Sequence, residues 1–189
     1  MDMIRKTAAR YGIPLSQDSI EALAGISRRK EYGREQSILG LGDTSRHMYI
    51  VESGIVRQFY YKDGRNITEH FSCEGDVAFS IESLFRKEPT RLYMEAIEPS
   101  TVCEVEYSKL KELTLRHSDI NALLQAILEA DLVQSQRKAD SWRFETSHER
   151  YERFCREYPE ASRRASIAHI ASYLLMSPET LSRVRSGKL

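Results

Sequence analysis

The sequence is poor in the residues that build metal centres, disulfides and enzyme active sites. Its three cysteines, Cys73, Cys103 and Cys155, lie far apart and form no Cys-x-x-Cys pair, so we expect reduced thiols and no zinc or iron–sulfur site. The five histidines form no His-x-His cluster of the kind that a cupin metalloenzyme needs. No catalytic Ser/His/Asp or Cys/His arrangement and no GxxxxGK loop is evident. We therefore expect no metal, no catalytic residues and no enzymatic activity.

Long apolar segments are also lacking. No run approaches the length of about 18 residues that a membrane-spanning helix needs. The first residues, Met-Asp-Met-Ile-Arg-Lys-Thr, lack the apolar segment of a secretory signal. These absences predict a cytoplasmic protein without a membrane partner. The 189 residues, of which 41% are hydrophobic, suffice for one ordinary domain and a smaller one.

Neither sign of charge predominates overall, but the charges are unevenly distributed. Residues 1–136 contain 17 Lys/Arg and 21 Asp/Glu, a balance of −4, whereas residues 137–189 contain 11 and 7, a balance of +4. Within residues 161–189, Glu179 is the single acid beside five basic residues. A local basic patch of this kind can bind phosphates, and the acidic remainder limits non-specific binding to nucleic acid.

Short β-type runs separated by turn residues occupy about residues 27–107. The runs cover residues 48–51, 55–61, 67–71, 77–80, 93–96 and 101–105, with Gly and Asp between them. Asp63-Gly64 between two apolar runs is a strong hairpin signal. This spacing, with helical patterns before and after it, predicts an α+β protein built on an antiparallel sandwich or barrel.

Helices are expected on both sides of this region. Short ones are predicted at residues 3–11, 15–25 and 108–115, with Ser16 capping the second, and another at 147–158 that Pro159 ends. A long helix over residues 118–144 has two apolar stripes, so one can pack on its own domain and the other on a second copy. The alternative is one wide stripe buried in a single core. We assign the dimer contact to Ile120, Leu123, Ile127 and Ala130; the neighbouring stripe is Leu124, Leu128 and Leu132.

Residues 166–185 have the pattern of a helix-turn-helix. The first helix is predicted from apolar residues at helical spacing, which are Ile167, Ile170, Ala171 and Leu174. Ser177 and Pro178 suit the cap and first position of a second helix. The turn often needs a positive φ, and at Leu175 this would cost about 1–2 kcal/mol. The second helix would bury Leu181 and Val184 and present Thr180, Ser182, Arg183 and Arg185 outward, as DNA reading requires. The alternative is an ordinary helical hairpin with solvated arginines.

Several motifs follow one another along nearly the whole chain. They are Gly42-Asp43, Tyr49-Ile-Val-Glu-Ser-Gly-Ile-Val-Arg57, Asp63-Gly-Arg65, Phe71-Ser-Cys-Glu-Gly-Asp-Val77, Ile170-Ala-Ser-Tyr-Leu174 and Pro178-Glu-Thr-Leu-Ser-Arg183. In this order they resemble the Crp/Fnr family of bacterial transcription regulators, especially its short members of the Bacteroidetes type. The resemblance implies an antiparallel β-roll (a double-stranded, jelly-roll-like β-helix) with N-terminal helices at 1–115. It further implies a dimerisation helix at 116–146 and a DNA-binding helix-turn-helix domain at 147–189.

The resemblance also implies how DNA is bound. Family members are homodimers that place two recognition helices in successive major grooves of a palindromic operator, about 34 Å apart. Glu179, Ser182 and Arg183 match the E-x-x-S-R pattern that reads the half-site in Fnr-like members. The expected phosphate contacts are Thr180, Arg185, Lys188, Arg163 and Arg164. RNA polymerase is a further partner that such a regulator implies.

Members that bind cyclic nucleotides hold the ribose with a Gly-Glu pair and the phosphate with an Arg-Ser pair. The corresponding residues here are Gly75-Asp76 and, in reversed order, Thr90-Arg91. The reversal moves the guanidinium to the opposite face of a strand or to a shifted loop, so we expect no classical binding of cyclic AMP. Two possibilities stay open, namely an unknown small-molecule effector or no effector at all. The candidate pocket residues are Gly75, Asp76, Phe79, Thr90, Arg91 and Tyr93, with Phe59 and Phe71 as further lining.

A second function class stays open at this point. The chain could be an effector-binding β-roll with a degenerate helix-turn-helix that no longer binds DNA. The leucine at position 175 of the turn favours this alternative, and retained DNA binding would exclude it.

Overall fold

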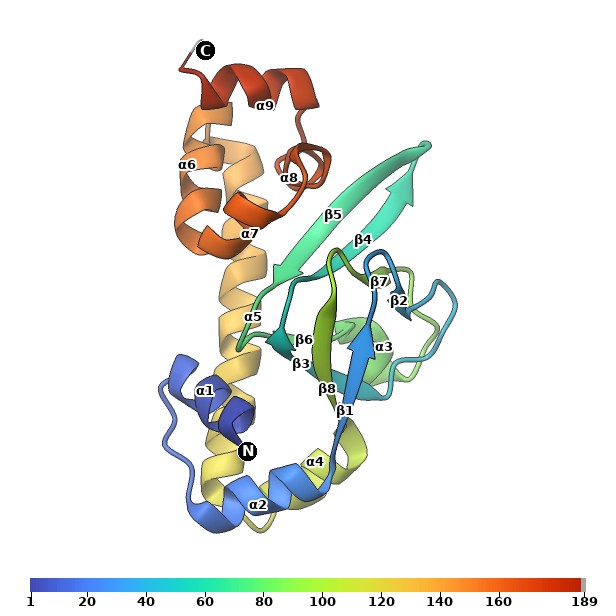
Figure 1. Ribbon diagram of the computed structural model, residues 1–189, viewed down its shortest axis with the longest axis vertical. Helices are drawn as coiled ribbons and strands as arrows, with labels where there is room; N and C mark the ends of the chain where they lie inside the picture. The colour runs from blue at the N-terminus through green and yellow to red at the C-terminus, as the bar shows by residue number, and fades with distance from the viewer. Residues whose placement is uncertain (188–189) are drawn as a thin grey trace.

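Two antiparallel sheets form the centre of the computed structural model, which describes residues 1–187 (Figure 1). One sheet contains, in this order, β1 (Ser27–Tyr32), β8 (Ser100–Glu106), β3 (His47–Ser53) and β6 (Val77–Ala78). The other contains β2 (Ser37–Leu39), β7 (Tyr93–Ala96), β4 (Val56–Lys62) and β5 (Arg65–Ser72). Inward side chains of both sheets pack in one cluster, among them Val51, Val56, Met94 and Val102. The expected α+β fold with an antiparallel β-roll is confirmed.

The hairpin between β4 and β5 forms where its turn residues predict it. Asp63 and Gly64 both have positive φ, at 51° and 72°, which is the backbone of a tight two-residue turn. Lys62 pairs with Arg65 directly across this turn. In Figure 1 the hairpin projects from the β-roll toward the C-terminal end of the molecule.

Strands β1 and β2 are absent from the sequence prediction for a physical reason. β1 has the sequence Ser-Arg-Arg-Lys-Glu-Tyr, with its charged residues exposed, and it lies at the edge of its sheet. Charged side chains protect such an edge from pairing with other chains, but they remove the apolar alternation that reveals a strand. β2 is three residues long and pairs with β7 in an irregular register.

The helix α5 (Ser118–Phe144) has the predicted bounds and runs along the β-roll to the C-terminal end (Figure 1). Its buried face packs with α1 (Asp2–Arg10), α2 (Gln17–Gly25) and α4 (Tyr107–Thr114) in one apolar cluster. Ser16 caps α2 as predicted, because its side chain accepts a hydrogen bond from the Ser19 amide at 3.2 Å. The remaining helix of the β-roll is α3 (Ile81–Arg86).

The predicted dimer stripe on α5 is wrong for three of its four residues. Ile120, Leu123 and Ile127 are buried in the chain's own core, at 0%, 6% and 6% exposure, and cannot contact a second copy. Ala130 is exposed. On the neighbouring stripe, Leu124 is buried in the same core at 8% exposure, whereas Leu132 is 70% exposed. The periodicity alone did not show that both stripes pack inward over the first half of α5.

The C-terminal helices α6 (Ser147–Glu157), α7 (Pro159–Arg164), α8 (Ile167–Tyr173) and α9 (Pro178–Arg185) complete the chain. Thr146 and Glu149 form a capping box at the start of α6. Pro159 ends α6 as predicted, but it also begins α7, which the sequence prediction lacks. A proline suits the first position of a helix because its missing N–H has no partner there in any case.

The β-roll and the C-terminal helices share one apolar cluster. It contains Ile55, Phe71 and Ile97 from the β-roll together with Phe154 and Tyr173 from the C-terminal helices. The division at residues 1–115, 116–146 and 147–189 stays a prediction.

All three cysteines are free thiols. Within residues 1–187 no helix is long and apolar enough to cross a membrane, and no three His, Cys, Asp or Glu side chains are grouped to hold a metal ion.

Candidate functional site

Helices α8 and α9 form the predicted helix-turn-helix. Ser177 caps α9 by accepting a hydrogen bond from the Thr180 amide at 3.1 Å, and Pro178 occupies the first helical turn. Leu175 has a φ of 52° and is the left-handed residue that the turn requires. The amide of Met176 then donates to the carbonyl of Ala171 at 3.0 Å, which closes the end of α8. The chain therefore tolerates the predicted strain at Leu175.

One residue of α8 departs from the predicted pattern. Ile167 is 40% exposed, whereas Tyr173 is buried with Ile170, Ala171 and Leu174. Ile167 is the first residue of the helix, so its side chain extends past the apolar contact. The long aromatic side chain of Tyr173 reaches the shared cluster instead.

Helix α9 separates apolar from polar side chains as a recognition helix must. Leu181 and Val184 are buried at 0% and 2% exposure, as predicted. Glu179, Ser182 and Arg183 are all exposed. Ser182 and Arg183 lie three and four residues after Glu179, so all three are near one another on the helix surface. A hydrogen bond from the Ser177 side chain lowers the pKa of Glu179, which is therefore an acceptor at neutral pH.

The expected phosphate-binding residues differ in their exposure and in their contacts within the protein. Arg185 is exposed, and its Nε donates to the Tyr151 hydroxyl at 3.1 Å. Thr180 is half-buried beside the cap, and Arg163 pairs with Glu160 on its own helix. Arg164 is held by Glu74 and Glu98 of the β-roll. Lys188 lies outside the described residues.

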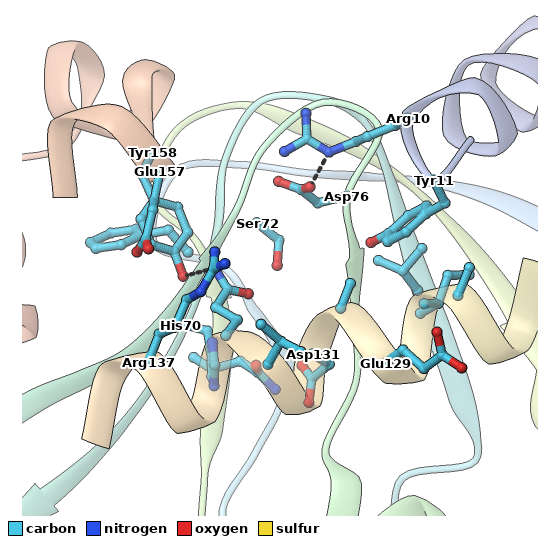
Figure 2. Close-up of a pocket in the computed structure, with 18 residues that line it drawn as sticks. Arg10, Tyr11, His70, Ser72, Asp76, Glu129, Asp131, Arg137, Glu157 and Tyr158 are labelled. Atoms are coloured by element: carbon cyan, nitrogen blue, oxygen red, sulfur yellow. Dashed lines mark hydrogen bonds and ion pairs between the residues drawn. The ribbon is translucent and has the colours of Figure 1, made fainter. Parts of the chain in front are cut away.

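Two neighbouring cavities lie between the β-roll and α5. The smaller, of about 330 Å³, is lined by Phe79, Thr90 and Arg91, as predicted, and also by the start of α3. The larger, of about 780 Å³, lies between α1, β5, α5 and the end of α6 (Figure 2). Both volumes are within or close to the range of small-molecule sites.

The Gly75-Asp76 pair makes its contacts within the protein in this structure. Gly75 has a φ of 90° in the tight turn before β6, and the Asp76 carboxylate accepts a hydrogen bond from the Cys73 amide at 2.8 Å. Arg10 of α1 forms an ion pair with Asp76 at 2.5 Å, as Figure 2 shows. Asp76 lines the larger cavity and Arg91 the smaller one, so these two expected pocket residues lie in neighbouring cavities.

Other predicted pocket residues are engaged within the protein. The Thr90 hydroxyl lies 3.0 Å from the Ser80 hydroxyl and accepts from the Leu92 amide at 3.0 Å. Tyr93 stacks on Phe59 with ring centroids 5.1 Å apart, and neither lines the two cavities. Phe71 lines the larger cavity. These residues were predicted to line the pocket because of their positions in the strands. The sequence could not show which face of each strand borders a cavity.

The sequence prediction missed the residues that line both cavities, Gln58, His70 and Asp131. Burial raises the pKa of Asp131 to about 6. Burial and the nearby Lys138 charge lower the pKa of His70 to about 3, so this ring is neutral at physiological pH. A carboxyl group and a neutral imidazole therefore face the space that a ligand would occupy. They come from β5 and α5, which no sequence motif connects.

Comparison with known proteins supports the same architecture. Residues 29–117 match the family model of the cyclic nucleotide-binding domain. FixK2 from Bradyrhizobium japonicum is 25% identical, with a TM-score of 0.73 over 86% of this chain and 84% of that chain. The c-di-GMP-responsive global regulator CLP from Xanthomonas campestris is 22% identical, with a TM-score of 0.70 over 91% of both chains.

The catabolite activator protein of Thermus thermophilus is also similar, with 22% identity and a TM-score of 0.58 over 92% of this chain and 83% of that chain. No curated protein sequence matches the chain. Residues 29–117 are therefore similar to a cyclic nucleotide-binding domain, and the chain as a whole shares its fold with these three proteins.

Proposed function

We propose that this chain is a sequence-specific DNA-binding transcription regulator that acts as a homodimer and carries a small-molecule site in its β-roll. The observation that carries the proposal is the division of α9. Its apolar residues Leu181 and Val184 are buried, and Glu179, Ser182 and Arg183 form an exposed row. Such a row can enter the major groove of DNA while the buried side holds the helix in place.

The three exposed side chains suit the edges of base pairs. Arg183 can donate two hydrogen bonds to O6 and N7 of guanine. Glu179, whose pKa is lowered, can accept from the amino group of cytosine. The short hydroxyl side chain of Ser182 can approach a base edge or a thymine methyl group. Arg185, Thr180, Arg163 and Lys188 are the proposed phosphate contacts, and Arg164 joins them only after it is released from the β-roll.

The proposed dimer uses the outward face of α5. Leu128 is half-buried there, and Leu132 and Trp142 are 70% and 38% exposed. Apolar residues that are exposed along one side of a long helix can pack against the same residues of a second copy related by a two-fold axis. This pairing would present two copies of α9 to a palindromic operator.

The proposed effector is a small molecule other than a classically bound cyclic AMP. In the smaller cavity Arg91 is exposed and the Asp131 carboxyl group lines the same space. A negative carboxylate beside the single guanidinium opposes a cyclic phosphate, and the Asp76 carboxylate is already bound to Arg10. The cavity therefore suits a ligand that carries a hydrogen-bond donor toward Asp131.

Two arginine substitutions on α9 test DNA reading. Arg183→Ala should cost about 1–3 kcal/mol on a site with the contacted guanine and should relax the preference at that position. Arg185→Ala is the matched control on the same helix, and it should weaken binding to all sequences alike. Binding is measured for both variants by selection from random duplexes followed by titration. An unchanged preference in Arg183→Ala would refute the role of this residue.

A further inference from the structure

The C-terminal helices lie directly against the β-roll in this structure. Phe71 of β5 packs among the rings of Phe154, Tyr158 and Tyr173, with centroid distances of 5.8, 6.0 and 5.7 Å. Figure 1 shows α8 beside the hairpin of β4 and β5. This apolar contact holds the two parts together, but it has little directional preference.

Polar contacts fix the orientation of the two parts. The Thr68 and Ser172 hydroxyl oxygens lie 2.6 Å apart, and the Thr68 amide donates to the Ser172 hydroxyl at 3.3 Å. Lys138 of α5 is buried, and its ammonium group donates to the carbonyls of Thr68 and Glu69. The Thr68 amide is therefore a direct reporter of whether α8 is docked on β5.

A charged contact between the two parts involves a predicted DNA-binding residue. Arg164 of α7 donates to both carboxylate oxygens of Glu74, at 3.0 and 2.8 Å, and it also binds Glu98. Glu74 is held in place because it accepts from the Gly54 amide at 2.9 Å. The Arg164, Glu74 and Glu98 side chains are 30%, 22% and 19% exposed, so water screens this group less than an ordinary surface pair.

We infer that Glu74 and Glu98 form an acidic clamp, which binds Arg164 and so docks the C-terminal helices on the β-roll. The clamp competes with DNA phosphate for Arg164. A guanidinium binds carboxylate and phosphate through the same planar set of donors, and two carboxylates already occupy it here. DNA that binds Arg164 must therefore open the clamp, and a closed clamp must lower DNA affinity by the same factor. The competition with phosphate rests on the proposed function, whereas the docking does not.

The variant Glu74→Gln/Glu98→Gln tests the clamp and keeps the oxygen that accepts from Gly54. Docking is measured by hydrogen exchange of the Thr68 amide in the DNA-free protein, and exchange should be about three- to tenfold faster than in the unmodified protein. Affinity is measured with a mixed-sequence DNA duplex at low salt, since phosphate contacts do not depend on sequence. The variant should bind this duplex about fivefold more tightly or better.

The matched control is Glu88→Gln/Glu152→Gln. It removes two exposed acids, neither of which contacts Arg164, and leaves the clamp, so it measures the gain in affinity from charge alone. Arg164→Ala should speed the Thr68 exchange like the clamp variant, yet it should gain no affinity because it also loses the phosphate contact. This difference in affinity between the two variants separates competition for Arg164 from simple loosening of the docked helices.

Two results would overturn the inference. Unchanged exchange at Thr68 in the clamp variant would show that Glu74 and Glu98 do not dock the C-terminal helices. Faster exchange with an affinity no higher than that of the control would show that docking and DNA binding do not compete. If no variant binds any duplex, the proposed function fails instead, and the exchange result alone decides the docking.

Discussion

Leu175 is a non-glycine residue that holds a left-handed conformation, with a φ of 52°, at the centre of the α8–α9 turn. Its side chain is 46% exposed, so little packing is gained in return for the strain. Leu175→Gly should raise the free energy of unfolding by about 0.5–1 kcal/mol, since glycine adopts this φ without a clash. Urea denaturation measures the change.

The control for this substitution is Leu175→Ala, which shortens the side chain but keeps the strained φ. It should leave the stability within about 0.5 kcal/mol of the unmodified protein. An equal gain in the alanine and glycine variants would show that the side chain, and not the backbone, is the source of the strain.

Asp131 predicts a defined pH dependence. Burial raises its pKa to about 6, above the value of about 3.9 in an unfolded chain. The folded protein thus holds the Asp131 proton more tightly than the unfolded chain does. The contribution of this proton to the free energy of unfolding is complete below about pH 4 and is lost as the pH rises through about 6. Asp131→Asn, which stays neutral, should be more stable than the unmodified protein at pH 7 by about 1–2 kcal/mol, and equally stable near pH 4. Urea titrations at both pH values check this, and a difference that is the same at both would contradict it.

The residues of α9 could be predicted from sequence, whereas those of the cavities could not. Ser177, Pro178 and the alternation of Leu181 and Val184 with polar side chains are local signals, because a helix and its cap are set by neighbours within four residues. Asp131 and His70 meet across 61 positions of sequence, and only the packing of α5 on β5 brings them to one cavity. Arg164 is a similar case, since Glu74 and Glu98 bind it from two separate turns.

At the scale of elements, Ile127 and Leu132 of α5 have opposite environments, because Ile127 is 6% exposed and Leu132 is 70% exposed. Ile127→Asp should lower the free energy of unfolding by about 3–5 kcal/mol, because it buries an unpaired charge in the core of α1 and α5. Leu132→Asp should leave the stability of the single chain nearly unchanged and should give a monomer in light scattering.

A control for the second substitution lies outside α5. Leu115 follows α4 and is 87% exposed, so Leu115→Asp adds the same charge away from the proposed dimer face and should leave the dimer intact. A dimer that persists in Leu132→Asp would show that the pair forms through another surface.

Strands and helices with apolar periodicity could be predicted from sequence, and the missed ones lack it. The strands β3 to β8 contain apolar runs and overlap their predicted positions. β1 is charged along its edge, and α7 is only six residues long, with its proline at the start. Periodicity identified the whole of α5 but not its inward side, since that choice depends on α1, α2 and the β-roll together.

At the scale of the whole molecule, the larger cavity lies where the β-roll meets the C-terminal helices that carry α9. The larger cavity is lined by His70 of β5, by Gln134 and Arg137 of α5 and by Tyr158 after α6. A ligand there would therefore touch both the β-roll and the C-terminal helices. The acidic clamp and the cluster around Phe71 complete the connection. A ligand can shift such an arrangement only if it binds one state more tightly than the other.

The most direct test of DNA reading is selection from a random duplex pool by the purified protein without added ligand. The account predicts enrichment of a two-fold palindrome whose half-sites lie about one helical turn apart and whose affinity falls steeply with salt. Repetition with Arg183→Ala should lose one position of that palindrome. Absence of any enriched sequence, from the unmodified protein and from the clamp variant alike, would contradict the claim that α9 reads DNA.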